Sequence, residues 1–599
     1  MNDISHLGQL LRAGQYEQVL SLLTQHYPNS LPTTELVKIA SFCEVNLGMF
    51  QNAISRLVSA RVASPKDNGL IISLCFAYAK QGDLSAAERH LKADIDFATL
   101  GPQECNELIF LINSFALSKV TVKTALDQLA KKYQSGASTK QAIEGLHQLL
   151  DIAKQKQVWA QALSFAKKLH QLTNKNNYII DQAIALRFLN RPSEGVPLLT
   201  SLASVMQHFA IYHNLANLYS DMGILDTALA CYEKAIALNP EYVESLVNHA
   251  KVAFELGQPE SWLNTFEQVL ARQQPSSPNA RHHSIAYINL LIESESYEQA
   301  ITYIASKANL LTPPIAALLK AKCLRLQNKP EAAYDVLKPY HNQGINEINQ
   351  ELLEISLTLQ DITGATQYIR TLKPAAKHNA PLGQILKANT YILDRLSQRP
   401  LETSVKDAVW EHSTDDSDVV LADIEKHMTT LHASLSTPVN QSVRQGTQTR
   451  GNLFPSTQPA LEALECFIKA QIQKYISKNA RYLGVSNEAL TSADNIEFTG
   501  SWSVLNKYDG YHVPHYHSNG LVSGVFYVDV PDGLDDKLTA GHLHIGKVDK
   551  APFYSLEPFM TVKPEKGKLV LFPSHLWHGT FPTEREGNRL TIAFDAVVV

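Results

Sequence analysis

Apolar residues recur at helical spacing through the first two thirds of the chain and at strand spacing in the last third. The clearest helical unit runs from Tyr212 to Pro240, and small and large apolar residues take fixed places in it: Leu215, Ala216, Tyr219, Gly223, Ala228, Tyr232 and Ala235. Small residues let two helices approach closely, and Pro240 ends the second one. The unit therefore predicts a helix hairpin.

The same pattern returns with a period of 34 residues. Gly48 is followed by Gly82 at this spacing, and Gly223 is followed by Gly257. Period and offsets resemble those of the tetratricopeptide repeat (TPR), a helix hairpin that stacks into a superhelical solenoid. Between these pairs the consensus weakens while helical spacing continues, so we expect a TPR-like array over residues 5–395.

The resemblance implies a binding role for the array. The concave face of such a superhelix usually holds a peptide or protein segment. We therefore expect a protein or peptide partner on this face. The alternative is that the array only scaffolds or dimerises the region that follows it, because a fold alone does not identify a ligand.

The helical period breaks near residue 400. Arg399–Pro400 and the polar run 413–418 predict a linker or domain edge over 396–418. Helices are expected at 419–435 and 460–475, and from Phe498 onward short β-type runs follow, at 521–530, 543–545, 568–572 and 590–598. Regularly spaced short strands predict an antiparallel jelly roll. The chain is thus expected to be multidomain, with an all-α solenoid followed over 419–599 by an all-β jelly roll with flanking helices.

Composition narrows the class of protein. Of 599 residues, 45% are hydrophobic and 19% are charged, which is typical of a folded protein. The net charge of −5 gives no indication of nucleic acid or an anionic membrane as a partner. The sequence contains neither a secretory signal nor an apolar run of about 20 residues, so a cytoplasmic location is expected.

Seven histidines gather between His512 and His578. Residues two apart on a strand share a face, so His515 and His517 can hold one metal ion together. His578 follows the apolar run Leu569–Phe572 and a short turn, and can add a ligand from another strand. Three such ligands leave positions for a chelating cosubstrate and dioxygen, as in the non-haem iron(II) oxygenases.

Other residues near these histidines have candidate roles. Arg589 lies on the next apolar run with Thr591 on its face, and a guanidinium beside a hydroxyl suits a buried carboxylate. His512 has the opposite strand parity to His515 and is expected to be a hydrogen-bond partner of the ligands or a surface residue. His575 lies three residues before His578 and is expected to pack or form a hydrogen bond at the rim of the site. His542 and His544 form a competing pair.

These motifs together resemble a bacterial 2-oxoglutarate- and Fe(II)-dependent oxygenase domain of the double-stranded β-helix superfamily. The resemblance rests on four stretches: 441–454, Trp502–Val504, His515-x-His517 before Ser523–Tyr527, and Phe572–Thr580 before Arg589. It implies Fe(II) held by His515, His517 and His578, with 2-oxoglutarate and O2 as cosubstrates. Arg589 resembles the residue that pairs with the far carboxylate of 2-oxoglutarate, and Tyr527 can add a hydrogen bond to it.

The sequence departs from the superfamily pattern at His517, which stands where a carboxylate usually binds the metal. The leading hypothesis is a dioxygenase, a hydroxylase, whose TPR array recruits a protein or peptide substrate or partner. The alternative is a TPR scaffold with a catalytically silent metal-binding jelly roll, and His517 is the residue that motivates it.

Overall fold

The computed structural model describes residues 2–115, 117–135, 139–258, 261–274, 277–307, 309–377, 379–401, 403–414, 420–432, 442–454, 456, 458–485, 496–534, 539–584 and 586–598. Gln441 of the predicted oxygenase motif, residues 415–419 of the predicted domain edge and residues 433–435 lie outside them. Contacts divide the chain into two compact units, Met1–Ala185 and Leu186–Val598, here called the N-terminal and the C-terminal unit.

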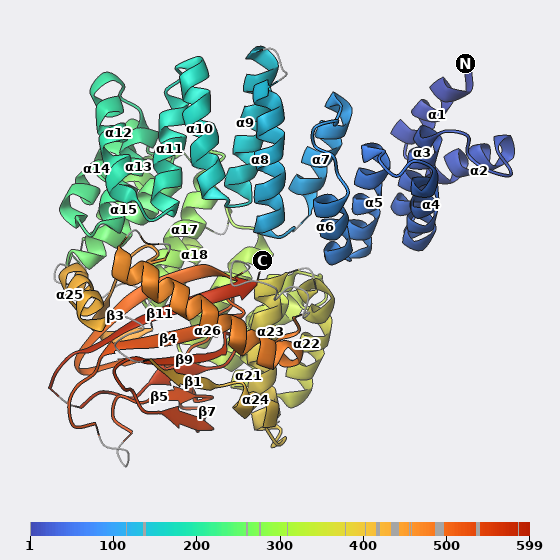
Figure 1. Ribbon diagram of the computed structural model, residues 1–599. Helices are drawn as coiled ribbons and strands as arrows, with labels where there is room; N and C mark the ends of the chain where they lie inside the picture. Colours follow the sequence, from blue (N-terminus) through green and yellow to red (C-terminus); the bar gives the residue numbers. More distant parts are fainter. Residues whose placement is uncertain are drawn as a thin grey trace. The chain divides into compact units, whose positions relative to one another are not determined.

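The N-terminal unit is a stack of helix hairpins (Figure 1). Gly48 and Gly82 take positive φ angles of 76° and 95° at the turns between paired helices, a conformation that glycine adopts without strain. The helices are α1 (Asn2–Arg12), α2 (Tyr16–His26), α3 (Thr34–Asn46), α4 (Phe50–Ala63), α5 (Asn68–Gln81), α6 (Leu84–Ala93), α7 (Pro102–Ser114), α8 (Lys119–Ser135), α9 (Thr139–Gln155) and α10 (Trp159–Thr173), and α11 (Asn177–Phe188) crosses the unit boundary.

The hairpins continue in the C-terminal unit, where Gly223 and Gly257 make equivalent turns with φ angles of 75° and 77°. The helices are α12 (Pro192–Val205), α13 (Phe209–Asp221), α14 (Leu225–Leu238), α15 (Val243–Glu255), α16 (Asn264–Arg272), α17 (Ala280–Glu293), α18 (Tyr297–Ser306), α19 (Pro313–Leu326), α20 (Pro330–Leu337), η1 (Lys338–Tyr340), α21 (Asn346–Thr358), α22 (Ile362–Ala376) and α23 (Ala380–Leu396). The predicted TPR-like helical solenoid is confirmed.

Residues after Leu396 form a β-rich region with three antiparallel sheets. The large sheet has the order β1-β9-β4-β11-β3-β2, and the small sheets have the orders β10-β5-β8 and β6-β7. The strands are β1 (Trp410–Ser413), β2 (Val443–Gln448), β3 (Ile496–His512), β4 (Val522–Asp529), β5 (Leu543–Ile545), β6 (Val548–Lys550), β7 (Tyr554–Leu556), β8 (Met560–Val562), β9 (Lys568–Pro573), β10 (His578–Thr580) and β11 (Arg589–Val598). This arrangement agrees with the predicted jelly roll.

Two helices cover the outer face of the large sheet. These are α25 (Leu421–His432) and α26 (Pro459–Leu483), and α26 lies across the strands in Figure 1. Ile468 and Ile472 of α26 pack in one core with Phe526 of β4 and Leu571 of β9. Alternate residues of these strands face the opposite side and pack towards the three-stranded sheet. The large sheet is therefore buried on both faces.

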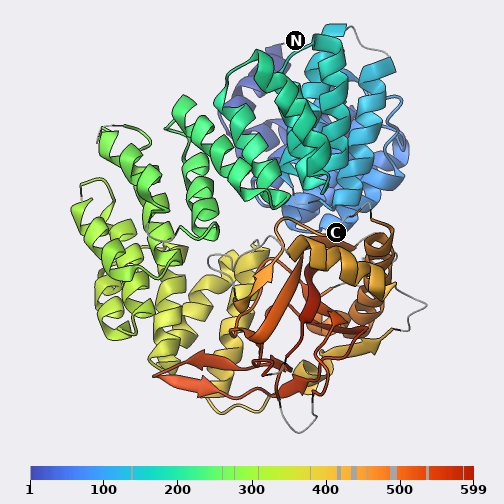
Figure 2. The ribbon, with the colours of Figure 1, turned by 90° about the vertical axis from the view of Figure 1, so that its left-hand side faces the viewer.

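The C-terminal repeat helices pack against the small sheets, and Figure 2 shows them beside the strands. Trp577 and Val548 belong to the hydrophobic core of α21, α22 and α23. The hydroxyl of Tyr391 donates to the carbonyl of Gly546 at 2.7 Å, and the indole of Trp577 donates to the carbonyl of Ala388 at 3.3 Å. Repeats and strands thus share a core.

The stretch predicted as a domain edge contains regular structure. Helix α24 (Thr403–Asp407) follows the last repeat helix, and β1 then pairs with β9 at the edge of the large sheet. Among the described helices of the chain, none has the length and apolar character needed to cross a membrane.

Candidate metal centre

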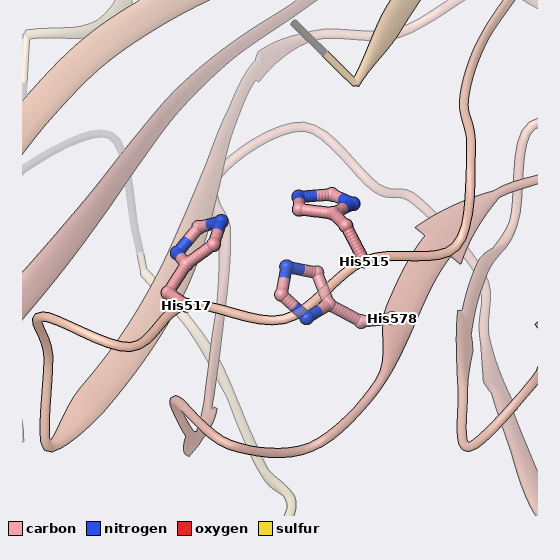
Figure 3. Close-up of side chains that lie close together, drawn as sticks. All are labelled: His515, His517 and His578. Carbon is pink, nitrogen blue, oxygen red and sulfur yellow. The ribbon is translucent and has the colours of Figure 1, made fainter. Parts of the chain in front are cut away.

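Three histidines converge at the edge of the three-stranded sheet (Figure 3). His515 forms an isolated bridge with His578, with backbone N–O distances of 2.9 and 2.8 Å, and the amide of His517 donates to the carbonyl of Ser574 at 2.9 Å. One ring nitrogen of each histidine lies within 4.8 Å of one ring nitrogen of each of the others. The structure therefore brings the three predicted ligands together.

The other ring nitrogen of each histidine is held by an acceptor. Nδ1 of His515 lies 2.8 Å from the carbonyl of Val513, Nδ1 of His578 lies 2.9 Å from that of Leu576, and Nδ1 of His517 lies 2.6 Å from Oδ1 of Asp595. Each acceptor favours a proton on Nδ1, which leaves the Nε2 lone pair available. This is the arrangement that metal-binding imidazoles use.

Burial favours the neutral form of His515 and His578. Desolvation, with smaller contributions from neighbouring histidines, lowers the pKa of His515 to about 3 and the pKa of His578 well below its ordinary value. A metal ligand must be deprotonated at the binding nitrogen, so neutral rings are ready to bind an ion. The donor set fits Fe(II), although imidazole also suits other divalent metals.

Asp595 was not predicted as part of the site. Its Oδ1 accepts the hydroxyl hydrogen bond of Ser523 at 2.5 Å in addition to the contact with His517, and Ser523 lies 3.0 Å from the hydroxyl of Ser574. Strand alternation places Asp595 on the same face of β11 as Arg589 and could have indicated it. Its contact with His517, 78 residues away, depends on the fold.

Arg589 lies deeper on the same face of β11. It is 2% exposed, its guanidinium carbon stands 5.2 Å from the ring centre of Tyr527, and its Nε has no hydrogen-bond partner among the described residues. Burial raises the pKa of Tyr527 while the nearby guanidinium opposes this shift. A buried cationic donor without a partner is costly, so the position fits an anionic ligand such as a carboxylate.

Thr591 lines the cavity at this end, and Asn506 lies opposite Arg589 on the neighbouring strand, outside the cavity lining. Thr591 faces Tyr527 across the β11–β4 pair, and Arg589 faces Asn506 across the β11–β3 pair. Both polar atoms of the buried Asn506 side chain lack a hydrogen-bond partner among the described residues. Asn506 was missed because β3 was not recognised as a strand in the sequence. The three histidines, Arg589 and Thr591 all line one cavity of about 670 Å3.

The remaining predicted histidines lie around this group. His512 lines the cavity, with Nδ1 3.0 Å from the hydroxyl of Ser442. His575 points elsewhere, with Nε2 3.3 Å from the hydroxyl of Tyr482. His544 packs against Phe581, with ring centres 5.0 Å apart. Within the described part of the chain, the candidate ligand cluster contains neither His544 nor its neighbour His542.

Gly579 allows the ligand strand to approach its neighbours. A Cβ atom at this position would lie 2.7 Å from the carbonyl oxygen of His512 and 2.7 Å from Cε1 of His544. Both distances are far shorter than ordinary contacts. The packing around the site therefore requires a glycine directly after His578.

Comparison with known proteins agrees with both parts of the chain. Residues 500–595 match the family described as "Putative 2OG-Fe(II) oxygenase", and residues 209–242 match the tetratricopeptide repeat. No curated protein sequence matches significantly.

Among solved structures, yeast Tom70 is similar at 14% identity, with a TM-score of 0.35, over 70% of this chain and 98% of its own. A tetratricopeptide repeat protein from Parabacteroides merdae is similar at 16% identity, with a TM-score of 0.30, over 41% and 98%. A prolyl-4-hydroxylase from Pseudomonas putida is similar at 17% identity, with a TM-score of 0.23, over 31% and 92%. The two sequence matches show that a tetratricopeptide repeat and, near the C-terminus, a domain of the family described as "Putative 2OG-Fe(II) oxygenase" are joined in this chain.

Proposed function

We propose that the protein is an Fe(II)- and 2-oxoglutarate-dependent dioxygenase that hydroxylates a protein or peptide. The observation that carries the proposal is the pairing, in one cavity, of three histidines with available Nε2 atoms and a buried arginine that has no carboxylate partner among the described residues. A purely structural histidine cluster would not need the arginine, and an ordinary ion pair would give Arg589 a carboxylate, which none of the described residues supplies.

His515, His517 and His578 would hold Fe(II), and Arg589 would bind the far carboxylate of 2-oxoglutarate with hydrogen bonds from Thr591 and Tyr527. When bound, the metal and the cosubstrate supply the oxidising chemistry, in which O2 and 2-oxoglutarate yield succinate, CO2 and an oxygenated substrate. The protein's part is to orient the cosubstrate and exclude water. The apolar residues Val525 and Ala593 also line the cavity and would help to exclude water from it.

The contact between His517 and Asp595 bears on the missing carboxylate ligand. Asp595 stands behind the imidazole of His517, 2.6 Å from its Nδ1. His517 itself takes the position from which a carboxylate binds the metal in the resembling enzymes. An anion that accepts the Nδ1 proton makes Nε2 a stronger donor and places negative charge near the centre. This contact favours the enzyme over a catalytically silent module.

The substrate part of the proposal rests on the repeats. A superhelical array binds extended chains, and its C-terminal hairpins pack directly beside the residues that flank the ligands. Tyr516, between His515 and His517, contacts Trp577 with ring centres 5.0 Å apart, and both pack against the repeat core. A protein or peptide held by the array would therefore be close to the cavity.

Succinate formation tests the proposal. The full chain supplied with Fe(II), 2-oxoglutarate and air should produce succinate, and the anaerobic ternary complex should show a weak visible charge-transfer band. His578→Ala should abolish both, whereas His341→Ala, on an exposed turn of the array, should abolish neither. If the unaltered protein gives neither succinate nor the band, the oxygenase proposal is wrong and the scaffold alternative is favoured.

A further inference from the structure

A second cavity lies beside the metal cavity and shares two wall residues with it. Its volume is about 510 Å3, and both Gln448 of β2 and Trp502 of β3 line the two cavities. The indole of Trp502 is 5.6 Å from the imidazole of His517 between ring centres. A ligand in the second cavity would be one side chain away from the candidate metal ligands.

The opposite wall of the second cavity is built by the repeat array. Tyr232 of α14 belongs to it, and its other residues lie on the first helices of successive hairpins, α11, α13 and α15: Arg187, Asn217, Ser220, Asp221, Asn248, Lys251, Val252 and Glu255. Within α13 and α15 they recur every three or four residues and so share one face of each helix. Arg187, Asp221 and Glu255 also follow one another at the 34-residue repeat spacing. Equivalent faces of consecutive repeats therefore form this wall.

Arg450 connects the two walls through polar contacts. Its guanidinium donates to the hydroxyl of Ser220 and pairs with Glu255. On the other side, the amide of Thr449 donates to the carbonyl of Ser503 at 2.9 Å, and its hydroxyl accepts from the amide of Ser503 at 2.9 Å. The segment 448–451 is thus held by β3 and by two repeat helices. The second cavity is a fixed part of the C-terminal unit.

The basic side chains of this cavity all have acidic partners. Arg187 lies 2.7 Å from Asp221, Lys251 lies 3.0 Å from Glu293, and Arg450 pairs with Glu255. A charged ligand would have to displace one of these partners. The other polar groups are amides and hydroxyls, among them Asn248, which donates to Asn217 at 3.1 Å. Groups of this kind match the alternating N–H and C=O groups of a peptide backbone.

We propose that the second cavity binds an extended, uncharged stretch of the polypeptide substrate and presents the adjoining residue to the metal cavity past Gln448 and Trp502. The inference rests on the proposed oxygenase function and assigns its substrate entrance. A small metabolite needs only the metal cavity. An extended chain also needs a surface leading to it, and the face of α13 and α15 supplies one.

Photo-crosslinking tests the entrance without relying on catalysis. Benzoylphenylalanine replaces Asn248 in the full chain, and the matched control carries it at Asn214, one repeat earlier and outside the cavity lining. Both proteins are irradiated with a fluorescent pool of random linear peptides and, separately, with a fluorescent mixture of free amino acids. We expect roughly tenfold more peptide labelling at 248 than at 214, because the crosslinker reacts only with a ligand that lies beside it.

Lys251 provides a second labelling position. Its side chain is 40% exposed, so the larger residue can be placed there without disturbing the core. Equal labelling at 214, 248 and 251, or equal labelling by peptides and free amino acids, would overturn the inference. Succinate formation by the unaltered chain separates the two proposals: succinate without selective labelling refutes only the entrance, whereas selective labelling without succinate refutes the oxygenase.

Discussion

The repeats of the two units form the same helix hairpin, but they carry different residues at one position of the first helix. Six residues before the turn glycine stands an aromatic residue in two repeats of the N-terminal unit, Phe42 and Phe76, and a polar residue in two repeats of the C-terminal unit, Asn217 and Lys251. With Phe110, the two phenylalanines form a series with ring centres 6.4 and 6.2 Å apart beside a groove of about 420 Å3. Small buried residues set the hairpin fold, whereas this inner position sets the chemistry of the surface.

A second difference lies in what the repeats support. The groove of the N-terminal unit leaves Phe42 and Phe110 exposed by 44% and 59%. In the C-terminal unit, helices α21 to α23 bury side chains of the β-rich region, among them Trp577 next to His578. The C-terminal repeats are therefore part of the framework of the candidate metal centre. The following predictions test this difference.

The largest effect is expected from Trp577→Ala. Trp577 is 7% exposed and belongs to the repeat core, so truncation leaves a cavity there and should lower the free energy of unfolding by about 3–5 kcal/mol. Urea unfolding measures this loss. The exposed Phe110→Ala should cost less than about 0.5 kcal/mol. If both substitutions cost the same, the repeats do not support the β-rich region as described.

Acid should loosen the C-terminal unit before the N-terminal unit. Burial lowers the pKa of His213 on α13 and of His432 on α25 to about 4. An unfolded histidine titrates near pH 6.5, so between about pH 6.5 and 4 the unfolded chain binds protons that the folded chain does not. The stability that these two groups contribute is complete above this window and falls as the pH falls through it.

Asp94 gives the N-terminal comparison. Burial would raise the pKa of this carboxyl, but hydrogen bonds and charge from His90 and Arg61 lower it overall. Its contribution is therefore lost only below about pH 3.9, the ordinary value for an aspartate. Hydrogen exchange followed by mass spectrometry between pH 7 and 5, corrected for the slower intrinsic exchange at lower pH, should show a larger loss of protection in α13 and α25 than in α6. An equal loss of protection in both units would contradict the prediction.

Asp595→Asn should weaken metal binding by about 10- to 100-fold, because a neutral amide holds the Nδ1 proton of His517 less strongly than a carboxylate does. Competition of the protein with a chelator for Co(II), a stand-in for Fe(II), measures the affinity directly. Asp529→Asn is the matched control, since Asp529 lies on the same sheet but outside the cavity lining. Unchanged affinity in Asp595→Asn would show that His517 is oriented without it.

The sequence predicted the parts of the fold that depend on local pattern. The strands 543–545 and 568–572 were found because they are short apolar runs. The histidine pair was predicted from the faces of a strand, but the structure places His515 and His517 between β3 and β4, where His515 forms only an isolated bridge. Strand β3 was not predicted because it buries polar residues such as Ser501, Ser503 and Asn506, which break the apolar pattern. Asp595 and the cavity wall on α13 were not predicted for another reason: their places at the site depend on contacts between residues far apart in the chain.

The smallest effects should come from exchanging the inner-face residues themselves. Asn217 is 4% exposed and accepts hydrogen bonds from Tyr232 and Asn248, so Asn217→Phe leaves buried polar groups unpaired and should cost about 1–3 kcal/mol. The reverse change at the equivalent exposed position, Phe42→Asn, should cost less than about 0.5 kcal/mol. Thermal unfolding of the two variants measures both. In the C-terminal unit the inner position belongs to a buried hydrogen-bond network, whereas in the N-terminal unit it lies on the surface. The two substitutions should therefore lower the free energy of unfolding by different amounts. Equal losses would show that the two kinds of repeat do not differ in this way.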